Sequence, residues 1–298
     1  MIQCMASEEL QILRELLRGT DLGSLTIAER RQATAFAAAS PPAGTAVDLV
    51  DADGVPAEWV APPGVSPGRV LLYFHGGAYQ IGSPANLRHL VALLSGAAGA
   101  RALSVDYRLA PEHPFPAAIE DALAAYRWLL ASGVDPALIA VAGDSAGGGL
   151  ALGALVALRD AGDPMPAGAV MLSPWTDLAL TGDSLRTRAA VEVMVKPEGL
   201  PEDVALYLAG ADPRHPYASP LYADLRGLPP LLIQVGDAEV ILDDSTRLAA
   251  RASEAGVEVS LEIWDDMPHV FPAFAGLLPE ADQAIERVGS WLDRRWTS

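Results

Sequence analysis

The sequence predicts an α/β protein with a mostly parallel sheet, and two patterns carry this prediction. Short, continuously apolar segments are typical of strands that are buried on both faces. They occur at 70–74, 102–107, 138–142, 167–173, 229–236 and 257–264. Segments with helical spacing lie between them, at 86–98, at 117–130 and directly after residue 145. This alternation indicates one central sheet, of about eight strands once an N-terminal hairpin is counted, flanked by helices.

The first 62 residues add two helices and that hairpin. Leucines at positions 10, 13 and 17 recur at helical spacing, which predicts an amphipathic helix over residues 8–18. The segment TIAE places Glu29 three residues after Thr26. This is the pattern of a capping box, so a second helix should begin there. An Asp-Gly turn between two apolar stretches at 47–62 predicts the β-hairpin.

The interval 175–227 interrupts the alternation of strands and helices. It is rich in Asp, Arg and Pro, and it joins two strands that should be neighbours. Long connections inside compact domains are usually functional or carry helices of their own. We therefore expect residues 1–45 and 176–215 to form a helical cap over the strand ends, where ligands bind in open α/β sheets. Residues 46–175 and 216–298 should form the α/β domain beneath it.

Composition argues against several classes of function. The chain has 20 Lys and Arg residues against 38 Asp and Glu residues, a net charge of -18. Such a charge repels phosphate backbones and anionic lipid headgroups, which disfavours nucleic acid and membrane surfaces as partners. Cys4 is the single cysteine, which leaves no intramolecular disulfide and no four-cysteine zinc site. The acidic start does not resemble a signal peptide, and the apolar run 146–158 is too short to span a bilayer, so we expect a cytoplasmic protein.

The segment GDSAG at 143–147 places a serine between an apolar strand and an alanine-rich helix. A strand that turns sharply into a helix would expose the Ser145 hydroxyl above the sheet, as in the nucleophile elbow of the α/β hydrolases. Gly143 and Gly147 allow so tight a turn, and Ala146 would present its backbone N–H at the helix start. Alone, the motif also fits an ordinary helix entry made of small residues. The motif therefore indicates a catalytic serine only if the sequence also contains an oxyanion-binding loop, an acid and a base.

A glycine-containing loop, HGGAY at 75–79, directly follows the strand at 70–74. Glycine lets backbone N–H groups come close to a substrate and face a developing negative charge. The alternative is an ordinary glycine turn at the end of a strand. The position on a long strand upstream of the serine favours an oxyanion-binding loop.

A base is expected near the C-terminus, where DDMPHVF places His269 on a loop after the strand at 257–264. The other histidines lack this position; they are His75, His89, His113 and His215. Serine, acid and histidine follow one another in this order in the α/β hydrolases. His269 is therefore the candidate base rather than a solvated surface residue.

The acid should follow the strand at 229–236, where GDAEVILDDS offers four carboxylates: Asp237, Glu239, Asp243 and Asp244. Asp243 and Asp244 lie where a helix begins, and capping of that helix explains at least one of them. Asp237 and Glu239 remain, and spacing alone does not choose between them.

These segments together resemble the bacterial hormone-sensitive-lipase-like esterases with the GDSAGG motif, which have the α/β-hydrolase fold. The resemblance rests on HGGAY at 75–79, DYRLAPEHPFPAAIEDA at 106–122, GDSAGGG at 143–149, ASPLYADLRGLPPLLIQVGDAEVILDD at 218–244 and MPHVF at 267–271. It begins near residue 70 and continues to the C-terminus. The combination is far more specific than the serine motif alone.

The resemblance implies a role for each site residue. Ser145 corresponds to the nucleophile and His269 to the base, while the oxyanion donors are the backbone N–H groups of Gly76, Gly77 and Ala146. Many members read DPLRDE where this chain has EVILDD, so the resemblance favours Glu239 over Asp237 as the acid.

Other residues of the shared motifs have lesser expected roles. Members usually have a third glycine where this chain has Ala78, whose methyl group is expected to narrow the acyl or alcohol pocket beside Tyr79. Asp144 and Arg108 are expected to fix loops by ion pairing rather than to take part in chemistry.

The activity that the resemblance implies is that of a serine carboxylesterase. It would hydrolyse short- to medium-chain acyl esters with water through an acyl-enzyme, without a metal or an organic cofactor, and a homodimer is compatible with it. The same groups could cleave a lactone, a carbamate or an aryl amide, because these reactions share a tetrahedral oxyanion. A non-catalytic receptor is the alternative from another class. Plant gibberellin receptors resemble this family but lack the catalytic histidine, which this chain retains as His269.

Overall fold

The computed structural model describes residues 7–19, 25–36 and 39–296, so Cys4 and the start of the chain lie outside the described residues. Eight strands form one sheet in the order β1-β2-β4-β3-β5-β6-β7-β8. They are β1 (Ala46–Asp51), β2 (Pro56–Ala61), β3 (Ser66–Phe74), β4 (Ala100–Val105), β5 (Ile139–Asp144), β6 (Gly168–Leu172), β7 (Leu231–Gly236) and β8 (Val259–Trp264). The strands from β3 to β8 are parallel, and β2 is antiparallel to both β1 and β4. The predicted mostly parallel sheet is confirmed.

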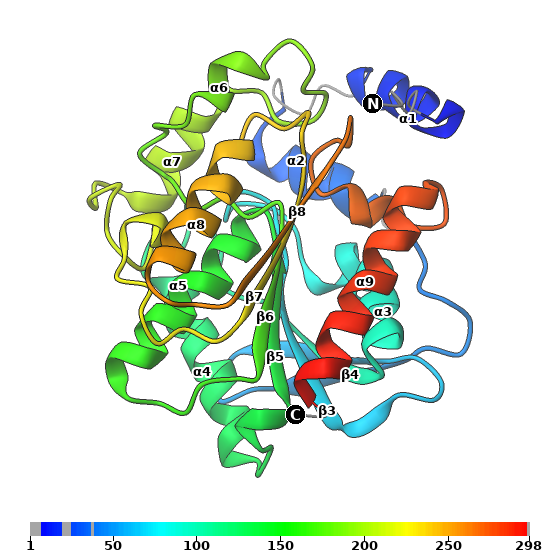
Figure 1. Cartoon of the computed structure of the whole chain (residues 1–298), viewed down its shortest axis with the longest axis vertical. Helices are drawn as coiled ribbons and strands as arrows, with labels where there is room; N and C mark the ends of the chain where they lie inside the picture. Colours follow the sequence, from blue (N-terminus) through cyan, green and yellow to red (C-terminus); the bar gives the residue numbers. More distant parts are fainter. Residues whose placement is uncertain (1–6, 20–24, 37–38, 297–298) are drawn as a thin grey trace.

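Helices cover both faces of this sheet (Figure 1). One layer holds α4 (Ala117–Ala131), α5 (Ala146–Ala161) and α8 (Leu242–Glu254), and the other holds α3 (Pro84–Ala98) and α9 (Pro279–Trp296). Alternate residues of β3 contribute to the two cores, Leu72 and Phe74 to the first and Leu71 and Tyr73 to the second. Because both faces of β3 are buried, its sequence is continuously apolar.

The terminal helix α9 adds to the predicted elements. Its buried residues include Ala281, Ala284, Ile285, Val288 and Leu292, which recur at intervals of three and four. This spacing places them on one face, which packs against α3 and the sheet.

The predicted N-terminal elements are confirmed. The two helices are α1 (Glu8–Arg18) and α2 (Ile27–Phe36), and β1 pairs with β2 as the hairpin. At the start of α2 the Thr26 N–H donates to Glu29 Oε2 at 2.8 Å, and the Glu29 N–H donates to Thr26 Oγ1 at 3.3 Å. These reciprocal bonds are the capping box that the sequence predicts.

Four helices gather at one end of the sheet in Figure 1: α1, α2, α6 (Ser184–Thr187) and α7 (Leu200–Leu208). The Arg14 side chain of α1 donates to the Asp266 carbonyl, just after β8. Arg31 of α2 donates to the carbonyl of Gln80, which follows β3. The interval 175–227 therefore carries helices of its own, and α1 and α2 contact loops at the carboxyl ends of the parallel strands.

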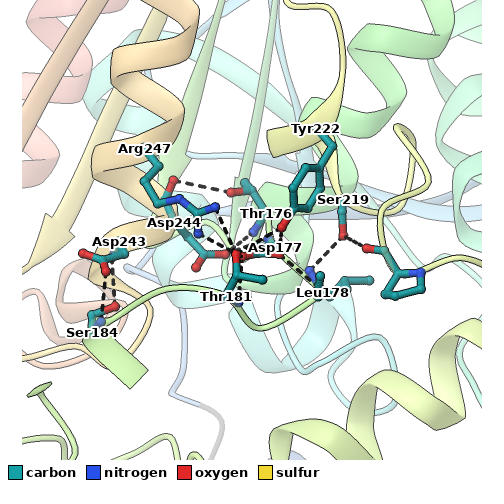
Figure 2. A network of polar contacts seen from close by, with 12 residues as sticks. Thr176, Asp177, Leu178, Thr181, Ser184, Ser219, Tyr222, Asp243, Asp244 and Arg247 are labelled. Carbon is teal, nitrogen blue, oxygen red and sulfur yellow. Dashed lines mark hydrogen bonds and ion pairs between the residues drawn. The ribbon is translucent and has the colours of Figure 1, made fainter. Parts of the chain in front are cut away.

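A buried polar network fastens the chain that leaves β6 to helix α8 (Figure 2). Asp244 Oδ2 accepts the N–H groups of Thr176 and Asp177 at 2.7 and 2.8 Å. The Asp177 carboxylate accepts hydrogen bonds from the side chains of Arg247 and Thr181. This network fixes the connection between the sheet and α6.

The expectation that Asp243 or Asp244 caps its own helix is wrong. Helix α8 begins at Leu242 after Ile241, and no side chain makes a capping hydrogen bond there. Asp243 instead accepts the N–H of Ser184 at 2.9 Å, and Asp244 binds the connection described above. A tertiary contact thus replaces the local one that the sequence position suggests.

Replacing Asp244 tests the strength of this network. Asp244→Ala would leave two buried N–H groups without an acceptor and should lower the free energy of unfolding by about 2–4 kcal/mol. Burial raises the pKa of Asp244 to about 8, so wild-type stability should fall as the pH rises from the ordinary carboxyl range through this value. Asp244→Asn keeps an acceptor and has no proton to lose. Its stability relative to wild type should rise over the same range.

Urea unfolding at pH 6 and pH 9 would measure both effects. A wild-type level of stability for Asp244→Ala at both pH values would contradict the account of the network.

Candidate active site

Ser145 lies at the sharp turn between β5 and α5, as the sequence predicts. Its backbone has a positive φ, with φ 51° and ψ -122°, a sparsely populated conformation that costs a non-glycine residue about 1–3 kcal/mol. The Ser145 N–H donates to the Leu172 carbonyl at 2.9 Å, and the Ser145 carbonyl accepts the Trp175 N–H at 2.9 Å. A Cβ at Gly147 would lie 2.1 Å from the Phe74 carbonyl oxygen. Only glycine fits there, so the turn needs the small residues of the motif.

The side chains of Ser145, His269 and Glu239 form one chain of hydrogen bonds. His269 Nε2 lies 2.9 Å from Ser145 Oγ, and His269 Nδ1 lies 2.7 Å from Glu239 Oε2. The carboxylate partner places the proton on Nδ1, which leaves the Nε2 lone pair facing the serine hydroxyl. Glu239 and His269 are buried, and Ser145 is partly exposed. The three groups come from the loops after β7, β8 and β5 and meet at one edge of the sheet.

The two candidate acids have different partners. Glu239 Oε1 accepts hydrogen bonds from the Gly236 N–H and the Ser173 hydroxyl, each at 2.6 Å, while Oε2 faces His269. Asp237 Oδ1 instead accepts the N–H of Asp266 at 2.7 Å. Asp237 therefore joins the loops after β7 and β8, and Glu239 contacts the imidazole.

The surroundings of His269 act on its pKa in opposite directions. Burial disfavours the charged imidazolium and lowers the pKa. The charge and the hydrogen bond of Glu239 raise it, with smaller contributions from the charges of Glu192 and Asp144. The net result is a His269 pKa above the usual histidine value. The surroundings of His269 thus stabilise the imidazolium that forms when this side chain accepts a proton.

Gly76 does not offer a free N–H, which corrects the expectation for this residue. Its N–H donates to Asp144 Oδ1 at 2.9 Å, and the same oxygen accepts the Tyr73 hydroxyl at 2.7 Å. A Cβ at Gly76 would lie 2.3 Å from Asp144 Oδ2, so glycine is required for this close approach. Gly76 therefore serves to hold the loop against the serine turn.

Free N–H groups belong instead to Gly77 and Ala78, which follow Gly76, and to Ala146, which follows Ser145. Within the described part of the chain, the N–H groups of Gly77, Ala78 and Ala146 have no hydrogen-bond acceptor. Gly77 has φ 117° and Ala78 has φ 52°, so the loop runs through left-handed conformations. A Cβ at Gly77 would lie 2.2 Å from the Ile81 carbonyl oxygen, so this position requires glycine as well.

His75 fixes the orientation of the Gly76–Gly77 peptide. Burial lowers the pKa of His75 to about 4, so the ring is neutral at physiological pH. Its Nδ1 lies 2.7 Å from the Gly76 carbonyl oxygen and must donate, because a carbonyl only accepts. In a trans peptide the N–H points away from the C=O, so this bond directs the Gly77 N–H to the opposite side.

Tyr79 is packed in the interior, whereas Ala78 is partly exposed. The Tyr79 ring is buried and stacks on Tyr207 of α7, with ring centroids 3.7 Å apart and planes 5° apart. Tyr79 therefore joins the loop after β3 to α7.

Of the two residues expected to fix loops by ion pairing, Arg108 does so in the described structure and Asp144 does not. Arg108 forms ion pairs with Asp121 at 2.8 Å and Glu120 at 3.0 Å. Asp144 acts through the hydrogen bonds described above rather than through an ion pair. Ser173 was not among the predicted site residues; the available signal was a polar residue at the end of the buried strand β6.

Residues 7–19, 25–36 and 39–296 contain no group of three or more His, Cys, Asp or Glu side chains arranged to hold a metal ion. No helix among them combines the length and apolarity needed to cross a membrane.

Comparisons with known proteins agree with this geometry. A family model described as the alpha/beta hydrolase fold matches residues 71–273. An acetyl-hydrolase of Streptomyces hygroscopicus is 49% identical over 294 residues, which cover 97% of each chain. An esterase of Acinetobacter venetianus is 38% identical over 75% of this chain and 74% of its own.

Solved structures give the same result. The crystal structure of EstE5 soaked with p-nitrophenyl butyrate superimposes with a TM-score of 0.96 at 49% identity, covering 98% of this chain and 100% of that one. An esterase from the bacterial hormone-sensitive lipase family gives a TM-score of 0.95 at 48% identity, covering 98% and 99%. This chain therefore belongs to the α/β-hydrolase family, and within it to the hormone-sensitive-lipase-like branch that its motifs indicate.

Proposed function

We propose that this protein is a serine carboxylesterase that hydrolyses short- to medium-chain acyl esters. The observation that carries the proposal is the unbroken hydrogen-bond chain from Ser145 through His269 to Glu239. The relatives support it, since they include proteins named acetyl-hydrolase and esterase.

In the first half of the reaction, Ser145 Oγ attacks the ester carbonyl carbon while its proton passes to His269 Nε2. Glu239 stabilises the imidazolium that results. The carbonyl oxygen becomes an oxyanion, which the N–H groups of Gly77, Ala78 and Ala146 would bind. His269 then gives its proton to the leaving alkoxide, so an alcohol departs and the acyl group stays on Ser145.

The second half repeats these steps with water. His269 Nε2 takes a proton from the water as its oxygen attacks the acyl-enzyme, and the same N–H groups hold the second oxyanion. The proton returns to Ser145 Oγ as the carboxylic acid leaves, which restores the free enzyme. Every step uses side chains and peptide groups of this chain together with substrate and water.

We also propose that residues 1–45 and 176–215, of which residues 1–6, 20–24 and 37–38 lie outside the described part of the chain, form a cap that limits the length of the acyl chain. Helices α2 and α7 are joined by the Arg30–Asp203 ion pair at 3.7 Å. The stack of Tyr79 on Tyr207 connects α7 to the loop that carries Ala78. These contacts support a cap held close to Ser145. The homodimer and the cytoplasmic location stay predictions.

Two alternatives to ester hydrolysis are hydrolysis of a related acyl substrate and non-catalytic ligand binding. A lactone, a carbamate or an aryl amide would react through the same groups, so such a substrate stays a prediction of the same mechanism. A receptor would have no use for a histidine aligned between serine and carboxylate, and this alignment favours turnover.

The choice of acid predicts unequal effects of two substitutions. Glu239→Ala should lower kcat for p-nitrophenyl acetate by about 10³-fold or more, because the imidazolium loses its partner. Asp237→Ala should keep most of the activity, and Ser145→Ala gives the background rate. The assignment fails if Glu239→Ala stays active while Asp237→Ala loses activity.

The raised pKa of His269 predicts the pH dependence. His269 must be neutral to accept the serine proton, so kcat/KM should fall as the pH drops through this pKa. The midpoint should lie above about 6.5, the ordinary histidine value. Glu239→Gln removes the charge that raises the pKa while burial remains, so the midpoint should move to lower pH. A rate that stays flat down to pH 5 would rule out His269 as the base.

Acyl-chain preference tests the proposed cap. With p-nitrophenyl esters of increasing acyl length, kcat/KM should be highest for the short chains and should fall as the chain lengthens. An unchanged rate through long acyl chains would refute the cap as a limit on length.

A further inference from the structure

Ser173, the first residue after β6, binds the loops of both partners of Ser145. Its hydroxyl donates to Glu239 Oε1 at 2.6 Å. Ser173 Oγ in turn accepts the N–H of Val270, the residue next to His269, at 3.0 Å. Ser173 is completely buried, so bulk water does not compete for either bond. One hydroxyl thus joins the carboxylate to the backbone that carries the imidazole.

The two carboxylate oxygens of Glu239 have different hydrogen-bond partners. Oε2 faces His269 Nδ1, and Oε1 accepts both the Gly236 N–H and the Ser173 hydroxyl. Gly236 ends β7, the strand that leads into the Glu239 loop, so its bond to the carboxylate is a local one. Ser173 follows the neighbouring strand β6, so its bond ties the carboxylate to a different part of the chain. Two donors in different directions prevent the carboxylate from rotating away from the imidazole.

The backbone at this contact is strained on both sides. Ser173 has φ 47° and Val270 has φ 50°, in the left-handed region that β-branched residues rarely enter. Such conformations persist where the surroundings determine them, and they cluster at functional sites. Ser173 is held from its other side as well, because its N–H donates to the Gln234 carbonyl at 2.7 Å.

We propose that Ser173 is a positioning residue that holds Glu239 and the His269 loop in register for proton transfer from Ser145. The proposal rests on the esterase function proposed above. It assigns Ser173 no contact with the substrate. Loss of its hydroxyl should therefore impair the chemical step and leave substrate binding nearly unchanged.

Two substitutions and a matched control test this role. Ser173→Ala removes the hydroxyl. Ser173→Gly also removes it, and glycine adopts a positive φ without steric cost, so this variant should fold without the strain. Ser104 on β4 is the control, because its hydroxyl is equally buried and has no hydrogen-bond partner in the described structure. Ser104→Ala should match wild type.

For both Ser173 variants, kcat with p-nitrophenyl acetate should fall about ten- to a hundredfold while KM changes little, as expected for loss of a hydrogen bond to a charged group. The downfield proton NMR signal of His269 Nδ1–H provides a second readout. It should broaden through faster exchange with water in both variants and stay sharp in Ser104→Ala.

Wild-type kcat together with an unchanged Nδ1–H signal in Ser173→Gly would overturn the proposal. That result leaves the proposed function intact, because wild type would still hydrolyse the ester and Ser145→Ala would not. If wild type itself shows no turnover above Ser145→Ala, the esterase function fails first. The two failures are therefore distinguishable.

Discussion

The positive-φ backbone of Ser145 is the constraint on which the rest of the site depends. It is unfavourable for a serine, and hydrogen bonds to Leu172 and Trp175 hold it in place. The turn also brings Gly147 so close to the Phe74 carbonyl that a Cβ would collide with it. The end of β3 is thereby fixed against the start of α5. The loop after β3 and the serine are consequently parts of one packed unit.

Buried polar groups at the ends of successive strands complete this unit. Asp144 ends β5, Ser173 follows β6, Glu239 follows β7 and His269 follows β8. Burying such groups is costly unless they are hydrogen-bonded, and each is bonded to a neighbour from another loop. The bonds that make burial tolerable also fix the orientation of the reacting groups. Little reorganisation is then needed when charge develops in the transition state.

The sequence alone was enough to predict the features that depend on the order of segments and motifs along the chain. Continuously apolar segments that alternate with helical ones predicted the sheet, and the order of motifs led to Ser145 and His269. The acid was harder, because Asp237 and Glu239 share a loop and differ only in where their side chains point. The expectation for Gly76 failed because its N–H faces Asp144, a partner 68 residues away. Ser173 could be recognised only from the structure, where its hydroxyl donates to Glu239, a residue 66 positions away.

We infer that His269 and Glu239 make Ser145 nucleophilic, and covalent labelling measures this. A fluorophosphonate reacts with an activated serine, and the label can be located by intact mass and peptide mapping. We expect one label per chain, on Ser145, with labelling strongly slowed in His269→Ala. Labelling of another residue, or an unchanged rate in His269→Ala, would contradict it.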